Sequence, residues 1–547
     1  MALLDFFNFE NITFLMAILI SVMNAVLVVL FARKCFQILQ ISGYKIKGYN
    51  IWLKDTKAKY ISRLAMLAFL SLCCILVVNF LFDSYHENHL YSYLGLVFYV
   101  YFAIVFVVHA NKVPQKTPLV QTRRMARLTT LLFLVASVIS FALIWLSTVY
   151  IPFLRFGIVA LTPLLTPVLV PLIHFCLIPL EKLIRNNYIT RAKKKFAKME
   201  GLTVIGITGS YGKTSVKYIL NKMLAYKFNV CITPHSFNTP MGITKVILKY
   251  LKKENEILIA EMGAKEVGDI KYLCDIVKPH HAIITGISSQ HFETFGSIEN
   301  IAKTKNELIQ SLPENGIAVI NCDNQQSTKL FNECGLKNKF AVNDKDSCVK
   351  LENIKITSEG SKFDLVYNKK SQPAKTILLG RHNLRNIQIA ACLAVNLGVS
   401  LEDIAKALEE VEYIPHRLEP SVNGNVTILD DSYSANEEGV KSALEVLKTF
   451  EGKKICVTPG LVELGEKEFE VNENYGKLLG ETCDYVIIVN KINQQALQKG
   501  IESTKIKKEN VFYVENLELA KSHIPEITKA QTKFVVLFAN DLPDNYT

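Results

Sequence analysis

The residues that most clearly predict chemistry form a short glycine-rich loop, Gly209-Ser-Tyr-Gly-Lys-Thr. A β-rich run, residues 203–208, precedes this loop, and a helical pattern follows it. Glycines let backbone N–H groups approach phosphate oxygens, and the helix N-terminus adds partial positive charge. The loop therefore predicts a nucleotide-binding site. It is shorter than the strict P-loop, because Ile207 stands where that motif has its first glycine.

Two side chains of this loop have specific expected roles. Lys213 would reach the terminal phosphates of a nucleotide, and Thr214 would offer its hydroxyl to Mg²⁺. The full set expected around the phosphates is Gly209, Ser210, Tyr211, Gly212, Lys213, Thr214 and Ser215.

Three residues further along could serve the same site, although each also has an ordinary interpretation. Glu261 ends a β-rich run, so its carboxylate should emerge beside the loop at the carboxyl edge of a parallel sheet, but such acids are more often solvated. His291 follows another β-rich run and is more often a loop or core residue than a ligand. Lys305 lies in a helical stretch, where a surface position is the usual one.

The elements that must position these residues follow from the pattern after Gly201. Short β-rich runs alternate there with amphipathic stretches, which indicates parallel strands covered by helices. The runs fall into two groups, so two α/β domains are expected, with a boundary near Tyr413 to Pro420 after a helical pattern over residues 401–411. The expected strands are residues 203–208, 257–261, 281–285 and 317–321, then 426–430, 454–459, 485–489 and 533–538.

The first part of the chain has a different pattern, with apolar stretches long enough to cross a bilayer of about 30 Å. The first stretch is read as a retained helix, because no basic segment precedes it and no small-residue cleavage site follows it. Four prolines interrupt the last stretch, which predicts a kinked or partly re-entrant span. The five stretches are Phe14 to Ala32, Leu64 to Phe82, Tyr91 to Val108, Leu128 to Tyr150, and Phe156 to Leu180.

Charge around these stretches predicts their orientation. The segment Arg33 to Arg63 carries eight basic residues and one acid, and Lys112 to Arg127 carries five basic residues and no acid. Such loops face the cytoplasm, so five crossings place everything after Lys182 inside the cell. Basic residues that follow directly, from Arg191 to Lys198, would lie against anionic lipid headgroups or form a solvated linker.

Composition excludes some other classes. The 547 residues carry a formal net charge of +12, but many of the basic residues flank apolar stretches, so membrane topology explains the charge better than nucleic acid does. The twelve cysteines show no paired metal-binding spacing, which predicts reduced thiols in a protein that faces the cytosol.

Seven blocks of sequence, in family order, resemble the Mur ligase family and within it the MurF type. They run from about Leu202 to Leu464 and cover roughly half of the chain. The blocks begin with GITGSYGKTS at residue 206, EMGAKEVGDI at 261, HFETFGSIENIAKTKNE at 291, GRHNLRN at 380, RLE at 417, DDSYSAN at 430 and ELGE at 463.

The resemblance implies an ATP-dependent, ADP-forming ligase that activates a carboxylate as an acyl phosphate and joins an amine to it as an amide. Lys213 and Thr214 would hold the ATP phosphates and one Mg²⁺, while Glu261 and His291 would bind a second Mg²⁺. Lys305 matches the family lysine that carries a carbamate, which converts a cation into an anion that helps to position the metal.

The same resemblance implies how the rest of ATP is bound. His382, Asn383 and Asn386 match the adenine-side motif, and Asn amides can pair a donor and an acceptor with a purine edge. Arg417 would meet a phosphate and Asp431 the ribose, both from the C-terminal domain. The expected architecture is a transmembrane domain over residues 1–198, a central P-loop-type ATP-binding domain over 199–412 and a C-terminal Rossmann-like domain over 413–547.

Two departures from the family leave the substrate open. The domain that grips the UDP end of the MurF substrate has no counterpart before Gly201, and the C-terminal lysine-glycine-serine element is absent after residue 535. A lipid-linked acceptor at the membrane and a soluble UDP-linked peptide with a purely anchoring membrane region are both compatible with this pattern. Other membrane-bound ligases, of poly-γ-glutamate type or for amidation of lipid-linked precursors, use the same activation. An ATP-driven transporter and an inactive scaffold are alternatives outside this chemistry.

Overall fold

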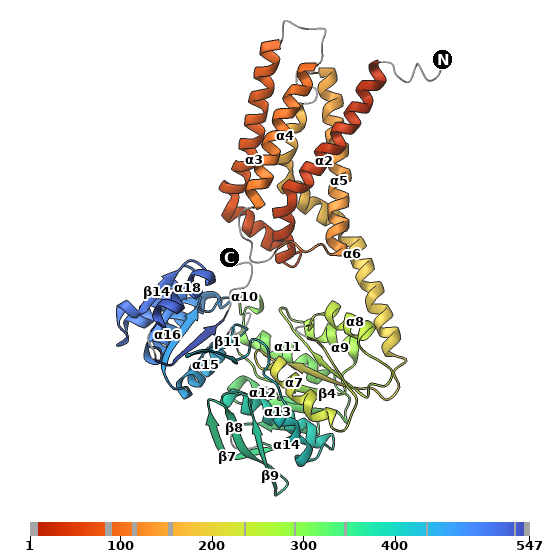
Figure 1. The fold of residues 1–547 in the computed structure, drawn as a ribbon. Helices are drawn as coiled ribbons and strands as arrows, with labels where there is room; N and C mark the ends of the chain where they lie inside the picture. The colour runs from red at the N-terminus through yellow and green to blue at the C-terminus, as the bar shows by residue number, and fades with distance from the viewer. Residues whose placement is uncertain are drawn as a thin grey trace. The chain divides into compact units, whose positions relative to one another are not determined.

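The computed structural model describes residues 9–82, 90–111, 118–150, 157–234, 237–288, 292–343, 347–433, 436–529 and 532–540. The chain forms two compact units, of which the first runs to Ile184 and the second covers Arg185–Leu542 (Figure 1).

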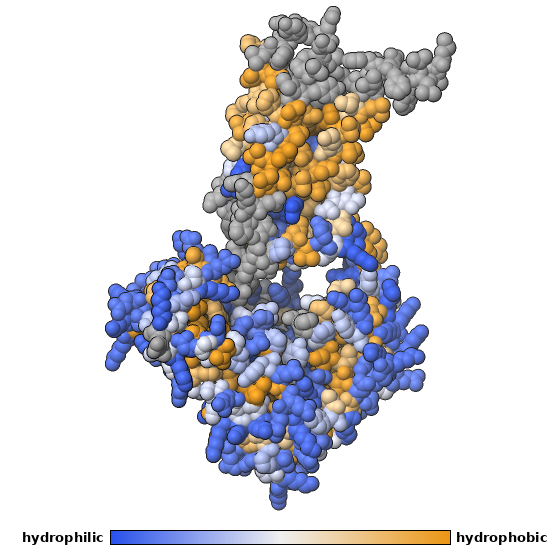
Figure 2. Space-filling view, viewed as in Figure 1, coloured by the Kyte–Doolittle hydropathy of each residue, from blue (hydrophilic) through white to orange (hydrophobic). Residues whose placement is uncertain are grey.

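The first unit consists of long apolar helices. Its elements are α2 (Phe9–Ile41), α3 (Ile46–Phe82), α4 (Leu90–Asn111), α5 (Arg123–Tyr150), the 3₁₀ helix η2 (Gly157–Leu165) and the beginning of α6 (Thr166–Phe196). Large apolar side chains face outward, such as Phe69 at 66% and Phe80 at 83% exposure, and apolar residues cover much of the visible face of this unit (Figure 2). A bilayer rather than water suits such a surface.

Four of the five predicted spans are found among the described residues, at Phe14–Ile41, Tyr60–Val78, Arg123–Tyr150 and Gly157–Phe196. The remaining one, Tyr91 to Val108, falls within α4, where Leu96–Val108 forms a shorter apolar helix. The predicted loop Arg33 to Arg63 is mostly helical, because α2 continues to Ile41 and α3 already begins at Ile46. Hydropathy marks where apolar residues end, whereas a helix can continue through lysine and arginine, which are good helix formers.

Two local features of this unit are relevant to a membrane setting. The predicted break in the last span is present, since η2 contains Pro163 and gives way to the α-helical α6 at Thr166. Asn24 donates to Ser140 Oγ and Thr162 Oγ1, each at 2.8 Å, and accepts a 2.7 Å bond from Tyr99 OH. The hydroxyls of Ser140 and Thr162 donate to backbone carbonyls of their own helices, so all four buried polar side chains are paired, as a lipid environment requires.

The second unit begins with a six-stranded parallel sheet of order β2-β3-β1-β4-β5-β6. Its strands are β1 (Thr203–Thr208), β2 (Val230–Ile232), β3 (Ile257–Glu261), β4 (His281–Ile284), β5 (Ile317–Asn321) and β6 (Asn338–Val342). The four strands predicted for this sheet are present, while the short β2 and the half-polar β6 have patterns too weak to indicate a strand.

Helices cover both faces of this sheet, because successive residues of β1 point to opposite faces and each packs against helices. Ile205 and Ile207 pack with α7, α13 and α14 on one face, and Val204 packs with α8, α9 and α11 on the other. The helices are α7 (Lys213–Ala225), α8 (Pro240–Lys249), α9 (Asp269–Val277), α10 (Phe292–Phe295), α11 (Ile298–Gln310), α12 (Gln325–Glu333), α13 (Arg381–Asn396) and α14 (Leu401–Glu409). A parallel sheet buried on both faces fixes the carboxyl ends of its strands firmly at one edge.

An antiparallel meander, β7 (Lys350–Thr357), β8 (Gly360–Tyr367) and β9 (Lys370–Thr376), was not predicted. Only part of one face is buried, through residues such as Phe363 and Leu365. Lysines and other mostly polar residues occupy the exposed positions, so apolar runs are missing. Asn368 and Lys369 both have positive φ angles, as a two-residue hairpin turn requires.

The last sheet has the order β10-β11-β15-β12-β13-β14, in which β10 is antiparallel to β11 and the other neighbours are parallel. Its strands are β10 (Glu419–Asn423), β11 (Val426–Asp431), β12 (Lys453–Thr458), β13 (Tyr485–Val489), β14 (Val511–Val514) and β15 (Phe534–Ala539). Its helices are α15 (Glu437–Thr449), η3 (Gly465–Lys467), α16 (Glu468–Thr482), α17 (Gln494–Glu502), η4 (Lys508–Asn510) and α18 (Leu517–Ile527). The predicted fold class is thus confirmed, while the domain limits stay a prediction.

Candidate nucleotide-binding site

The glycine-rich loop joins the central strand β1 to helix α7. Gly212 has a φ of +74° and precedes the helix without a side-chain cap, so the first N–H groups of α7 are left for another acceptor. A Cβ at Gly212 would lie 2.8 Å from Asn386 Oδ1, and one at Gly209 would overlap Thr285. Both positions therefore need glycine, as expected for a loop that other groups approach closely.

Residues after β4 hold the loop in place. The backbone N–H of Ser210 donates to Gly286 O at 2.9 Å, and Ser210 Oγ exchanges bonds with the backbone of Ser288 at 3.1 and 3.0 Å. Thr285 Oγ1 donates to the carbonyl of Tyr211. Burial, together with Asp323 and Glu438, raises the pKa of Tyr211 to about 12. The β4 loop was not singled out from the sequence, because its serines and threonines carry no spacing signal.

Lys213 lies at the start of α7, and its ammonium donates to Gly209 O at 2.6 Å. Burial lowers its pKa to about 8, against the raising effect of Glu261, and Arg417 lowers it further. A cation held in this way gains most from an anion such as a phosphate.

Glu261 ends β3 at the predicted edge, but it is buried rather than solvated, with 2% of its surface exposed. Its carboxylate accepts from Thr214 Oγ1 at 3.1 Å, Lys217 Nζ at 2.8 Å and Asn238 Nδ2 at 3.2 Å. Lys217 and Asn238 were missed in the sequence. Lys217 could have been found from its place on the same helical face as Lys213.

Lys305 lies on α11 and is buried, with 4% of its surface exposed. The ordinary interpretation of a lysine in a helical stretch, a surface position, is therefore wrong here. Burial lowers its pKa to about 7, and Lys213 contributes in the same direction, while Asp269 and Glu307 oppose it. Glu307 accepts the backbone N–H groups of Gly268 and Lys271 at 2.8 and 2.9 Å, which caps α9. The predicted ligand His291 lies outside the described residues.

The adenine-side residues occupy the first turns of α13. Asn383 Nδ2 donates to Leu379 O at 2.9 Å, and Asn386 Nδ2 donates to Asn383 Oδ1 at 3.2 Å. Asn386 thus lies against the phosphate loop, as its approach to Gly212 indicates. Burial, with a smaller effect of Arg417, lowers the pKa of His382 to about 4, and its Nδ1 has no hydrogen-bond partner among the described residues.

Arg417 precedes β10 in an unusual backbone segment, because its neighbours His416 and Leu418 have φ angles of +61° and +51°. Leu418 N donates to Asp431 Oδ1 at 3.2 Å, and His416 Nδ1 lies 2.8 Å from Asp430 Oδ2. Burial lowers the pKa of Arg417, against the raising effects of Asp431 and Glu261. Arg417 therefore interacts electrostatically with Lys213, Glu261 and Asp431.

His416, Glu419 and Asp430 also form a group whose potential ligand atoms lie within 4.8 Å of one another. Glu419 Oε2 accepts the His416 N–H at 3.2 Å, and Asp430 Oδ1 accepts from Ser432 N and Oγ at 3.0 and 2.7 Å. These bonds brace the turn that carries Arg417.

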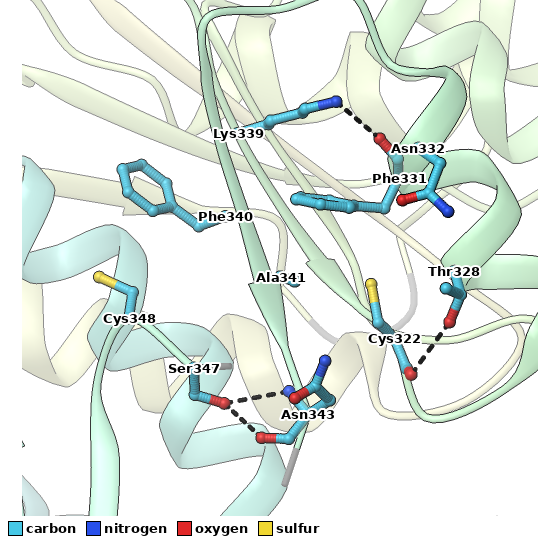
Figure 3. A pocket seen from close by; sticks show the side chains of 10 residues that line it. All are labelled: Cys322, Thr328, Phe331, Asn332, Lys339, Phe340, Ala341, Asn343, Ser347 and Cys348. Atoms are coloured by element: carbon cyan, nitrogen blue, oxygen red, sulfur yellow. Dashed lines mark hydrogen bonds between the residues drawn. The ribbon is translucent and has the colours of Figure 1, made fainter. Parts of the chain in front are cut away.

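A cavity of about 470 Å³ lies beside β6 and α12, and none of the predicted site residues lines it (Figure 3). Lys339 Nζ donates across it to Phe331 O at 3.0 Å, and Thr328 Oγ1 donates to Cys322 O at 3.3 Å. Ser347 Oγ bonds to the backbone of Asn343. These polar groups are already engaged with neighbouring backbone, and the chemistry-bearing residues lie elsewhere.

Comparison with known families gives two matches. The Mur ligase middle domain matches residues 207–394, and the Mur ligase glutamate ligase domain matches residues 416–540. Together these two ranges cover more than half of the chain.

Individual relatives agree with this assignment. The UDP-N-acetylmuramoyl-tripeptide–D-alanyl-D-alanine ligase of Escherichia coli is 34% identical over 48% of this chain and 58% of its own length. The enzyme of the same name from Haemophilus influenzae is 32% identical over 50% of this chain and 61% of its own length. The chain thus spans less than two thirds of the length of these relatives.

Solved structures show the same similarity in three dimensions. MurF from Acinetobacter baumannii has a TM-score of 0.60 and 25% identity, over 65% of this chain and 77% of that one. MurF from Thermotoga maritima in complex with ADP has a TM-score of 0.57 and 29% identity, over 65% of this chain and 80% of that one. With both domains matched in sequence and fold, this chain belongs to the Mur ligase family.

Proposed function

We propose that this chain is an ATP-dependent ligase that joins an amino acid or dipeptide to a peptidoglycan precursor through an amide bond. The observation that supports it best is the meeting of Lys213, Thr214 and Glu261 at the carboxyl edge of the parallel sheet. The relatives named for D-alanyl-D-alanine make that dipeptide the expected amine.

The residues present fit a nucleotide with Mg²⁺. The loop needs glycine at two positions where its neighbours come close, and α7 starts without a side-chain cap. Thr214 and Glu261 offer the oxygen ligands that Mg²⁺ prefers. His291 would complete the site for a second ion. Bound Mg²⁺ would neutralise charge on the phosphates during an in-line transfer.

Lys305 fits the role of a carbamate-bearing lysine. With its pKa lowered to about 7, a large share of its amine is neutral near neutral pH. A neutral amine can add to CO₂, forming an N–C bond and releasing one proton. The resulting carbamate would replace a buried cation beside Lys213 by an anion, and so remove a repulsion.

The reaction would proceed in two steps. An oxygen of the acceptor carboxylate attacks the γ-phosphorus of ATP, and ADP leaves. The amine then attacks the acyl carbon, inorganic phosphate leaves, and the amine loses a proton as the amide forms. Lys213 and Arg417 would neutralise charge on the transferred group, which is where such enzymes gain most of their rate.

The rest of the nucleotide would lie towards α13 and β11. His382 presents a buried nitrogen that has no hydrogen-bond partner in the described part of the chain, and such an atom favours a ligand that bonds to it. Asn383 and Asn386 would flank the adenine side, and Asp431 would meet the ribose hydroxyls.

We further propose that the first unit spans the cytoplasmic membrane and that the ligase domains face the cytoplasm. The apolar helices of that unit and the basic segments between them support this placement. An acceptor linked to a lipid would then be available at the bilayer, whereas a UDP-linked acceptor would arrive from solution.

A panel of acceptors would test the proposal. Purified full-length chain in detergent or nanodiscs would be given ATP, Mg²⁺ and D-alanyl-D-alanine, with phosphate release and amide product both measured. The expected result is product formation that depends on an acceptor peptide. Faster turnover with a lipid-linked acceptor would support an acceptor taken from the bilayer, whereas equal or better turnover with the UDP-linked tripeptide would refute a lipid-linked acceptor and leave the helices of the first unit as an anchor.

The same panel separates other functions. Acceptor-independent ATP hydrolysis would favour an ATP-driven transporter, an alternative that the membrane helices keep open. Product with L-glutamate or ammonia, but none with D-alanyl-D-alanine, would favour a ligase for another envelope polymer or for precursor amidation.

A further inference from the structure

Lys217 is a buried charged residue to which the proposed reaction gives no role. Its side chain is fully enclosed, with 0% of its surface exposed, and its ammonium lies 2.8 Å from Glu261 Oε2. It follows Lys213 by four residues and Thr214 by three on α7, so all three side chains share one face of that helix.

The two oxygens of Glu261 meet different partners. Oε2 accepts the charge-assisted bond from Lys217 at 2.8 Å, while Oε1 accepts from the neutral amide of Asn238 at 3.2 Å. The Thr214 hydroxyl lies 3.1 Å from Oε2 and 3.3 Å from Oε1. The backbone is fixed as well, because Glu261 N donates to Thr233 Oγ1 at 3.1 Å.

The contacts of Glu261 differ in strength, and Mg²⁺ is sensitive to the direction of its ligands. Bonds to ionised groups are roughly twice as strong as neutral ones, so Lys217 dominates the orientation of the carboxylate. Mg²⁺ requires near-ideal octahedral geometry, and small errors in the direction of an oxygen ligand weaken its binding. Groups that orient a ligand from behind typically change metal affinity by about 10- to 100-fold when removed.

We propose that Lys217 is a positioning residue that holds Glu261 Oε2 and so keeps Oε1 directed at the Mg²⁺–nucleotide complex. This inference rests on the nucleotide-binding part of the proposed function and not on amide formation. Lys217 contributes no ligand itself, since its ammonium has no acceptor to offer a metal.

Nucleotide binding with and without Mg²⁺ separates this role from a purely structural one. Full-length chain in detergent is titrated calorimetrically with a non-hydrolysable ATP analogue, once in Mg²⁺ and once in EDTA. In Lys217→Met the affinity gained from Mg²⁺ should fall by about tenfold or more. The affinity in EDTA should stay within about threefold of the unmodified chain, because the phosphate loop is untouched.

Two further variants complete the series. Lys217→Arg keeps a charged donor and should retain more of the Mg²⁺ effect than Lys217→Met. Lys222→Met removes a partly exposed lysine further along α7 and should change neither affinity. Removing one partner of a buried ion pair can prevent folding. For that reason Lys217→Gln, which keeps an uncharged donor, is measured alongside, with folding checked by circular dichroism.

Several results would overturn the proposal. An unchanged Mg²⁺ effect in a folded Met or Gln variant would show that Glu261 needs no help from Lys217. A larger Mg²⁺ effect would show that Lys217 only repels the metal, and an equal loss in EDTA would show a general structural role. Intact Mg²⁺-dependent binding without amide formation would refute the ligase reaction alone.

Discussion

The two units of the chain differ in whether their buried polar side chains are neutral or ionisable. In the first unit Asn24 bonds to Tyr99, Ser140 and Thr162, and the hydroxyls of Ser140 and Thr162 donate in turn to backbone carbonyls of their own helices, so this network is neutral and fully paired. In the second unit, ionisable groups gather around the phosphate loop. Lys213 and Lys305 have lowered pKa values there, so their charged forms are disfavoured until an anion arrives.

The difference indicates which cluster serves structure and which serves a ligand. A closed neutral network gains nothing from a ligand and serves to hold helices in register. The lowered pKa values show that burial of these two ammonium groups costs free energy. Buried ionisable groups with shifted pKa values are typical of binding and catalytic sites.

Removing the ammonium at the phosphate loop should have the largest effect. Lys213→Ala should lower ATP-dependent product formation by about 10³-fold, because charge on the transferred phosphate would lose its nearest cation. Thermal unfolding should change little, since burial already disfavours that charge. Lys222→Ala on the same helix is the matched control. Turnover within a few-fold of the unmodified chain would exclude Lys213 from the reaction.

Replacing the buried lysine of α11 should have the next largest effect. Lys305→Ala should lower turnover by about 10²-fold, through loss of the proposed carbamate anion. Added acetate or propionate should restore part of the activity, because a small carboxylate can occupy the place of the carbamate. Lys303→Ala, at an exposed position on α11, should have no effect. Absence of rescue, with full activity in Lys305→Arg, would contradict the carbamate.

Removing Asn24 from its buried hydrogen-bond network should lower the stability of the helical unit and leave ATP turnover unchanged. Asn24→Leu should destabilise the helical unit by about 1 kcal/mol, a usual value for a side-chain hydrogen bond between membrane helices. Trp52 and Trp145 are the two tryptophans of the sequence, so fluorescence during thermal unfolding reports this unit. Ser137→Ala, which loses a bond within its own helix, is the control. A large loss of ATP turnover in folded Asn24→Leu would assign the network a role beyond packing.

The stability of the parallel sheet that carries the site residues should depend on pH. Ile317 N donates to His281 Nδ1 at 3.1 Å, and burial, with His280 adding to it, lowers the pKa of His281 from 6.5 to about 4. The unfolded chain therefore binds the extra proton first, so stability present above pH 6.5 is lost as pH falls towards 4. His281→Asn keeps an acceptor without titrating. It should flatten the pH dependence of amide exchange at Ile317, and an unchanged profile would contradict this.

Much of the fold was predictable because the decisive strands are continuous apolar runs. Strands β1, β3, β4 and β5 are buried on both faces, and the helices of the first unit are long and apolar. The meander β7–β9 was not predictable in the same way, since lysines and other mostly polar residues occupy its exposed positions. Its turn at Asn368 and Lys369 was the available signal, because asparagine tolerates positive φ.

The site was partly predictable for a similar reason. Loop residues and Glu261 follow from strand ends, because parallel strands bring their carboxyl ends together. Burial of Lys305 was overlooked, although Ile301 and Leu308 flank it at helical spacing and mark that face as the core side. The partnership of Lys217 with Glu261 joins residues 44 positions apart, and no local pattern reports such a pair.

The position of β15 has a consequence for biosynthesis. This strand, Phe534–Ala539, lies between β11 and β12 in the C-terminal sheet, although it is made after all the other strands. Until it leaves the ribosome, β11 and β12 cannot be bridged, and their facing edges stay open to wrong partners. The helices of the first unit are synthesised long before that. The last domain therefore closes only after translation has passed residue 539, while the first unit can already have folded.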